Sequence, residues 1–226
     1  MNRLPMLRSA IIIFSAIVLF LLAGALPIFS KAPSIIFSNP LFLVLVCVLA
    51  LMICICCLRV DFSMRRIGFY AVHIGTVIII AGALLGYFRM QNSEFAVPCN
   101  SEGSFSELLL DNGNSIKLGF SCKVSDFHVK FYPEAQIPER FDAKIQFSID
   151  GKVSNEQLLM VNHPAYFKGW RFYLMDYDQG SQYHVVLFAK KDPGRMTAIA
   201  GIWILLFGAF VLCFRKNHLP PDGGVI

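Results

Sequence analysis

Residues 69–88 read FYAVHIGTVIIIAGALLGYF, an apolar stretch that contains one histidine, His73, and no acidic or basic residue. A helix needs roughly 20 apolar residues to span a bilayer. Comparable stretches, each almost free of charged residues, lie at about residues 9–30, 41–58 and 196–214. We therefore expect four transmembrane helices, three of them in a membrane region of residues 1–88.

The block of residues 89–195 between the third and fourth stretches is polar, and a tail of residues 215–226 follows the last one. The predicted fold class is therefore membrane α + β. Four transmembrane helices are expected, with an antiparallel β domain inserted between helices 3 and 4. The composition agrees, with 56% hydrophobic and 15% charged residues and a mean hydropathy of +0.59, which is typical of a membrane protein.

The net charge of +5 does not indicate a nucleic-acid partner. Residues 89–195 carry 12 Lys/Arg and 13 Asp/Glu, whereas the rest of the chain carries 8 and 2. Those basic residues gather near helix ends, at Arg3, Arg8, Arg59, Arg65, Arg66, Arg215 and Lys216. Basic loops and flanks remain in the cytoplasm. The sequence thus predicts a multi-pass protein of the bacterial inner membrane, in contact with lipid, with residues 89–195 on the extracytoplasmic side.

The first stretch has an alternative interpretation as a cleaved signal peptide. Arg3 and Arg8 resemble its basic region, and residues 22–25 resemble a small-residue cleavage site. The apolar part, residues 10–29, is longer than usual for a signal peptide. The side on which residues 89–195 lie is the same under either interpretation.

Glycines recur in the third and fourth stretches, at Gly75, Gly82, Gly201 and Gly208. Small residues let helix backbones approach closely in a membrane. We expect these two helices to pack together. Cysteines replacing Gly82 and Gly208 are expected to crosslink.

Residues 89–195 show the period of two that is typical of strands. Apolar side chains alternate in 145–149, before a two-residue hairpin turn at Asp150-Gly151. They also alternate in 118–131, with a shift of one residue near Ser125-Asp126 that predicts a bulge. Further strands are expected at 156–161, 171–177 and 183–189. The prediction is a small antiparallel sandwich or partly open barrel.

His73 is the strongest candidate for a functional residue. Ionisable groups inside a spanning segment are costly and mark functional sites, and neutral imidazole is a good ligand for haem iron. At 100° per residue, His73 points roughly opposite Gly82, so one face of the helix is free for packing while the other presents the imidazole. The alternative is an interfacial histidine that bonds to a neighbouring helix or to lipid headgroups.

The remaining histidines and cysteines are weaker candidates. His163 precedes Pro164 in a loop that could reach the membrane surface or a partner. His128 and His184 lie within strand patterns and are expected to be satisfied surface or core groups, and His218 lies in the cytoplasmic tail without supporting residues. Cys54, Cys56 and Cys57 crowd one end of the second stretch, where a soft metal is an option but an apolar packing role is favoured. Cys99 and Cys122 are the only cysteines on the expected extracytoplasmic side, and their spacing is compatible both with a disulfide and with two free thiols. Motifs of nucleotide-binding, zinc-protease, hydrolase and thioredoxin-like enzymes are absent, and no catalytic residue is predicted.

Several short motifs, in order, resemble the ResB family, also called CcsB, of the System II machinery for cytochrome c biogenesis. They cover about residues 65–215. Besides the histidine and glycines of the third stretch, the motifs are Leu118–Phe120, Val124–Phe127, Phe131–Pro133, Val161–Pro164, Gly169–Tyr173 and Lys191–Gly194.

The resemblance implies four spans, with a large extracytoplasmic domain between the third and fourth. It implies a CcsA/ResC-type partner, with which the protein moves haem b outward and holds it for thioether attachment to apocytochrome c. His73 matches the family's haem-ligating histidine, and the partner would supply the other axial ligand. The Val161–Pro164 and Gly169–Tyr173 motifs look structural or suited to docking.

Two departures from the family bear on this interpretation. The outer domain is short for the family, and the tryptophan-rich segment of the partner is absent, since the chain has only Trp170 and Trp203. The chain is therefore expected to be one subunit of a cytochrome c haem lyase (synthase) complex. Two other hypotheses remain. One is a membrane-anchored β-domain scaffold for another envelope complex, and the other is a thiol–disulfide role for Cys99 and Cys122.

Overall fold

The computed structural model describes residues 4–25, 38–99, 104–110, 112–133, 137–178 and 184–214. The predictions on His218 and on the tail 215–226 fall outside these residues. The chain divides into two compact units. The first comprises Met1–Leu85 and Gly194–Ile226, and the second comprises Gly86–Pro193.

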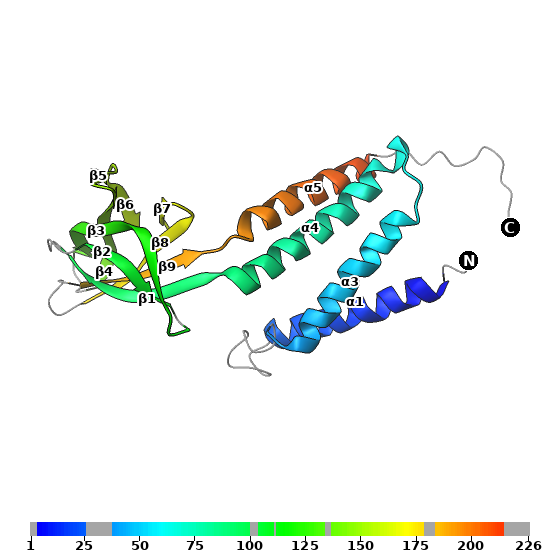
Figure 1. Ribbon diagram of the computed structural model, residues 1–226, viewed down its shortest axis with the longest axis horizontal. Helices are drawn as coiled ribbons and strands as arrows, with labels where there is room; N and C mark the ends of the chain where they lie inside the picture. Colours follow the sequence, from blue (N-terminus) through cyan, green and yellow to red (C-terminus); the bar gives the residue numbers. More distant parts are fainter. Residues whose placement is uncertain are drawn as a thin grey trace. The chain divides into compact units, whose positions relative to one another are not determined.

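The helices of the first unit are α1 (Leu4–Ala25), α3 (Pro40–Leu58), α4 (Ile67–Arg89, which ends in the second unit) and α5 (Arg195–Cys213) (Figure 1). A 3₁₀ turn, η1 (Met64–Arg66), leads directly into α4. Among the described residues, Pro40–Leu58, Met64–Arg89 and Arg195–Cys213 are long and apolar enough to cross a membrane, and the apolar part of α1, Ile11–Ala23, is shorter. The protein is thus a membrane protein with three candidate spans, and the fourth stays a prediction.

The close packing of α4 against α5 confirms the expectation from the glycines. A Cβ atom added at Gly75 would lie 2.7 Å from the backbone nitrogen of Leu205, and one added at Gly82 would lie 2.5 Å from that of Ala198. Only a residue without a side chain allows this approach of two backbones. The two helices therefore touch along faces lined with glycine.

The predicted partnership of Gly82 with Gly208 is wrong. Gly208 lies against Gly68 and Val72, at the opposite end of α4 from Gly82. The helices are antiparallel, so the far end of α5 meets the near end of α4. Equal glycine spacing in two helices indicates that they pack but does not give the register.

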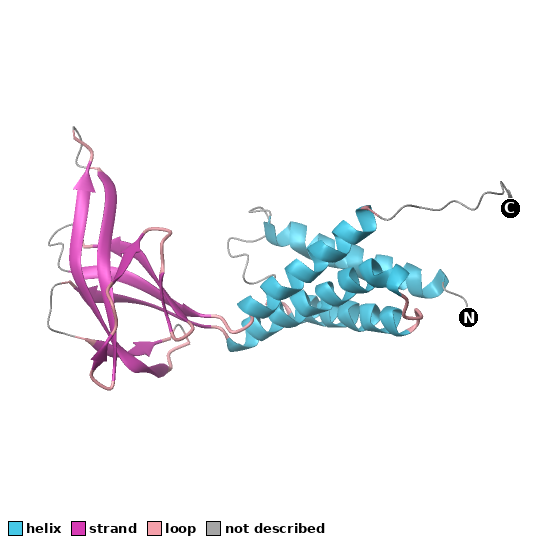
Figure 2. Ribbon diagram, turned by 90° about the horizontal axis from the view of Figure 1, so that it is seen from above, coloured by secondary structure: helices cyan, strands magenta, loops and turns pink. Residues whose placement is uncertain are grey.

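All strands belong to the second unit, as the colouring of Figure 2 shows. One sheet has the order β1-β9-β8-β7, and the other has the order β2-β3-β4-β5 with β6 also paired to β4. All pairs are antiparallel, as predicted. The strands are β1 (Gln91–Pro98), β2 (Phe105–Leu109), β3 (Ser115–Phe131), β4 (Pro138–Ile149), β5 (Lys152–Val153), β6 (Gln157–Met160), β7 (Ala165–Phe167), β8 (Trp170–Tyr177) and β9 (His184–Lys191).

The predicted bulge and hairpin are both present. Between the pairs Ser125–Lys144 and His128–Asp142, two residues of β3 face one residue of β4, and Asp126 has a φ of 49°. At the hairpin, Ile149 pairs with Lys152 across Asp150-Gly151, where both φ angles are positive. This is the two-residue turn that suits the twist of paired strands.

One core joins the two sheets, and phenylalanines dominate it. Phe172 of β8 is fully buried, with its ring centroid 5.4 Å from that of Phe147 in β4 and 6.5 Å from that of Phe120 in β3. Phe167 of β7 stacks on Phe147 with centroids 4.4 Å apart. Aromatic pairs of this kind add to the free energy of apolar burial, so this cluster is the main link between the sheets.

Candidate functional site

His73 lies in the seventh position of α4, about 9 Å along the helix from Ile67 at a rise of about 1.5 Å per residue. Gly68, Gly75 and Gly82 mark the face that contacts α5. His73 lies about 160° around the helix from Gly75. The imidazole is therefore on the face away from α5, where its side chain is partly exposed.

The hydrogen bond of His73 fixes the tautomer of the ring. Its Nδ1 lies 2.8 Å from the backbone carbonyl oxygen of Phe69. A carbonyl oxygen can only accept, so Nδ1 carries the proton and donates. In the neutral imidazole the lone pair is then on Nε2. Metal-binding histidines commonly have this arrangement, in which a bond from one ring nitrogen orients the other toward the metal.

The ring of Phe69 supports the imidazole. The two ring centroids are 4.0 Å apart, with the planes tilted by 37°. Phe69, one helical turn earlier, thus makes two contacts with the imidazole, one through its backbone carbonyl and one through its ring. The result is a partly exposed imidazole with a defined orientation, beside an aromatic surface.

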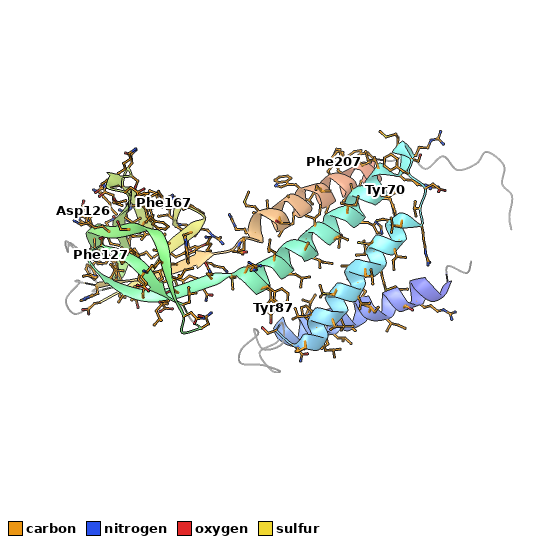
Figure 3. All side chains as sticks on the ribbon, viewed as in Figure 1. Tyr70, Tyr87, Asp126, Phe127, Phe167 and Phe207 are labelled. Atoms are coloured by element: carbon orange, nitrogen blue, oxygen red, sulfur yellow. The ribbon has the colours of Figure 1, made fainter. Side chains whose placement is uncertain are left out.

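Tyr70 holds the chain that leads into α4 (Figure 3). Its hydroxyl donates to the carbonyl of Val60 and lies 3.4 Å from the carbonyl of Cys57. Its ring lies 5.5 Å from that of Phe62. The end of α3 and the connection after it are therefore attached to the first turn of α4.

The described residues contain no group of three or more His, Cys, Asp or Glu side chains that could hold a metal ion. His73 therefore offers one ligand and not a complete coordination sphere. This donor set fits a haem, whose porphyrin already supplies four nitrogen ligands and leaves the axial positions to the protein.

The other described histidines lie in the second unit and are exposed. Nδ1 of His128 bonds to the Asp126 carbonyl at 2.8 Å, within the bulge of β3. His163 closes a tight turn with Met160 through backbone hydrogen bonds. His184 begins β9. None of the three belongs to a group of three or more metal-binding side chains in the described part of the chain.

Cys99 and Cys122 are both buried and both free, so they form no disulfide. Burial raises the pKa of Cys99 to about 11 and raises the pKa of Cys122 further. The thiolate is the reactive form, so both groups stay protonated and inert at neutral pH. This environment counts against the thiol–disulfide hypothesis. Cys54, Cys56 and Cys57 are also free thiols.

The Gly169–Tyr173 motif builds a hairpin. Lys168 and Gly169 both have positive φ angles and form the two-residue turn between β7 and β8. Trp170 is buried, and the Nζ of Lys191 lies 5.8 Å from its ring centroid. Lys191 belongs to a second motif, so the two motifs contact each other. Both have a structural role here.

The sequence indicates His73 as a candidate but not the contacts around it: Phe69 orients the imidazole, and Tyr70 anchors the connection that precedes α4. The available signal was spacing, because Phe69 precedes His73 by one helical turn and residues four apart on a helix are neighbours. The anchoring of Tyr70 to Val60 had no such signal. It depends on how the connection folds back on α4.

Residues 63–202 match the family model described as the ResB-like family. This match covers more than half of the chain. The chain belongs to the ResB-like family. His73, the glycines of α4 and the first eight residues of α5 lie inside the matched residues.

Curated relatives of this ResB-like chain carry cytochrome c biogenesis names. The cytochrome c biogenesis protein CcsB of Prochlorococcus marinus (strain MIT 9301) is 32% identical over 114 residues, which are 50% of this chain and 25% of that protein. The cytochrome c biogenesis protein Ccs1 of Thalassiosira pseudonana is 26% identical over 114 residues, 50% of this chain and 27% of that protein. The chain thus spans about a quarter of the length of these relatives.

Among solved structures, one titled Cytochrome c Heme Lyase CcmF overlaps this ResB-like chain. The TM-score is 0.42 at 13% sequence identity, over 88% of this chain and 34% of that one. At this score the likeness is partial.

Proposed function

We propose that this ResB-like chain is a haem-handling subunit of the System II cytochrome c synthase. It would work with a CcsA/ResC-type membrane partner to carry haem across the membrane and present it with apocytochrome c for thioether attachment. The CcsB and Ccs1 names of its relatives support a role in cytochrome c biogenesis. A membrane-anchored scaffold that does not bind haem is the competing function, and it gives no role to an oriented imidazole.

In this proposal His73 is an axial ligand of haem b. The observation that carries the proposal is the hydrogen bond from Nδ1 to the Phe69 carbonyl, since it leaves the Nε2 lone pair for iron. When bound, the haem supplies the iron and the porphyrin that is later joined to the cytochrome. Because His73 belongs to no group of three or more potential metal ligands among the described residues, the second axial ligand would come from the partner.

Replacing His73 with alanine is expected to lower the haem that copurifies with the chain and its partner by roughly ten-fold or more, because the iron loses a nitrogen ligand. Absorbance in the Soret region, normalised to protein, measures this loss. Added imidazole is expected to restore haem, since the alanine leaves room for a free ligand beside Phe69.

The matched control is His128→Ala, which removes an exposed histidine from a strand bulge. This variant is expected to retain its haem. Unchanged haem in His73→Ala, with a normal elution profile, would show that the proposed ligand is wrong and would favour the scaffold.

We also propose that the membrane region comprises residues 1–88 and 196–214, and that residues 89–195 face the extracytoplasmic side of a bacterial inner membrane. The charge distribution supports this orientation, because the connection between α3 and α4 carries Arg59, Arg65 and Arg66. The apocytochrome would then meet the β domain on the side where haem attachment takes place.

Met175→Cys provides a test of this orientation. Met175 lies in β8 and is 53% exposed, so its replacement should react with a membrane-impermeant maleimide in intact spheroplasts at pH 7. Cys99 and Cys122 should not react, because they are buried and protonated. Labelling only after lysis would place the domain inside the cell and would overturn the orientation.

A further inference from the structure

The face of α4 that carries His73 continues toward the start of the helix. Phe69 precedes His73 by four residues, and Arg66 precedes Phe69 by three, a spacing that places side chains on one side of a helix. Residues Met64–Arg89 form one uninterrupted helical stretch. Arg66 therefore lies two turns before the imidazole, about 10 Å along the axis. A cation, an aromatic ring and an iron ligand follow each other along one face.

Arg65 and Arg66 are both exposed, and neither forms an ion pair with a carboxylate of the described residues. Arg66 uses Nη1 to donate to the Asp61 carbonyl at 3.0 Å. A guanidinium has five donors, so most of them stay available. Asp61 is the one acidic residue between α3 and α4, against three arginines.

The position of the two arginines is fixed by contacts on both sides. Ser63 caps η1, with its hydroxyl 3.4 Å from the Arg65 backbone nitrogen. The Tyr70 hydroxyl attaches Val60 to α4. The connection is thus held against the start of the helix, where the helix dipole adds further positive potential.

We propose that Arg65 and Arg66 bind the carboxylate groups of the porphyrin whose iron His73 holds. This inference rests on the proposed function. A haem has a flat apolar body, a central metal and two carboxylates on one edge. The order imidazole, phenyl ring and guanidinium along α4 matches that order of groups. Arginine pairs with carboxylates through two parallel hydrogen bonds, which fixes the direction of the bound group.

In this arrangement the acidic edge of the porphyrin faces the water-exposed start of α4, and the opposite edge lies deeper along the helix. The arginines act as positioning residues. They select a porphyrin with free carboxylates and set its orientation, while His73 holds the iron.

The test compares haemin with haemin dimethyl ester, which has the same iron and ring but no carboxylates. Both are titrated into the full chain in nanodiscs of zwitterionic lipid, with the Soret band as the readout. The wild type is expected to bind haemin at least ten-fold more tightly than the ester. In Arg65→Gln/Arg66→Gln the affinity for haemin should fall to that for the ester, while ester binding stays unchanged and shows that the His73 site is intact.

The control is Arg89→Gln, which removes one arginine charge from the other end of α4 and should leave the preference for haemin in place. The nanodisc lipid carries no net charge. If Arg65→Gln/Arg66→Gln weakened haemin binding only in nanodiscs that contain anionic lipid, the arginines would bind lipid headgroups, and the proposal would be overturned. Equal binding of haemin and ester by the wild type, or no binding of haemin, overturns it too.

His73→Ala separates a failure of the arginine site from a failure of the proposed function, since it should weaken the binding of haemin and ester alike. If it does so while the arginine variant changes nothing, the carboxylate site is wrong and the proposed function stands. If His73→Ala changes neither affinity, the proposed function fails. The inference then fails too, because it places the porphyrin by its iron at His73.

Discussion

Gly82→Leu is expected to separate α4 from α5. A Cβ atom at this position would lie 2.5 Å from the backbone nitrogen of Ala198 and 2.9 Å from its Cα. Both are main-chain atoms, so the clash cannot be relieved by a side-chain rotation and the helices must move apart. Overpacking of this kind costs about 3 kcal/mol, and helix association in a membrane depends on close van der Waals contact.

A disulfide between the two helices measures the separation. A Cβ at Gly68 would lie 2.9 Å from the Cγ of Leu212, the position that a cysteine sulfur would take, so Gly68→Cys and Leu212→Cys should crosslink in a background without the other membrane cysteines. Adding Gly82→Leu should lower the yield several-fold. Ala83→Leu is the matched control, because Ala83 is exposed on the same helix. Equal yields for the two leucine variants would contradict the close packing at Gly82.

Phe172→Ala is expected to destabilise the β unit by about 3–5 kcal/mol, the usual cost of removing a buried aromatic ring. Phe172 is fully buried and contacts aromatic rings of the opposite sheet, including Phe105, Phe120 and Phe147. The cavity would lie between the sheets, where neither can close it alone. In a domain of this size the loss corresponds to a fall in Tm of roughly 15 °C or more.

Tryptophan fluorescence during thermal unfolding of the full chain measures this effect. Trp170 is buried, with its ring centroid 6.5 Å from that of Phe172, and so reports on the core. Met175→Ala in the same strand is the control, since Met175 is largely exposed and should change Tm little. A Tm for Phe172→Ala close to that of Met175→Ala would mean that Phe172 does not link the sheets.

The strands that alternate cleanly could be predicted, and β1 could not. The core positions of β1 include Ser93, which is fully buried and donates its hydroxyl to the Leu109 carbonyl of β2. A serine at a core position breaks the apolar alternation on which the prediction depends. β1 is a strand because β9 pairs with it over its whole length, and a partner almost one hundred residues away has no local signal.

In the candidate site, too, some features have a local sequence signal and others depend on distant segments. His73 could be selected as a candidate because a histidine in a spanning stretch is conspicuous, and its tautomer follows from the carbonyl of Phe69, four residues earlier. The hold of Tyr70 on Val60 could not be inferred, because it requires the connection between the helices to fold back.

The sequence by itself determined where apolar stretches are long enough to span a bilayer, where side chains alternate between core and water, and where the bulge and the Asp150-Gly151 turn lie. These features depend on residues a few positions apart, whose spacing is set by helix or strand geometry. Only the tertiary structure decided which glycines face each other in α4 and α5, the order of the strands, and that Cys99 and Cys122 remain free thiols. Those depend on the direction in which distant segments meet, and residue spacing within one segment contains no information about that direction.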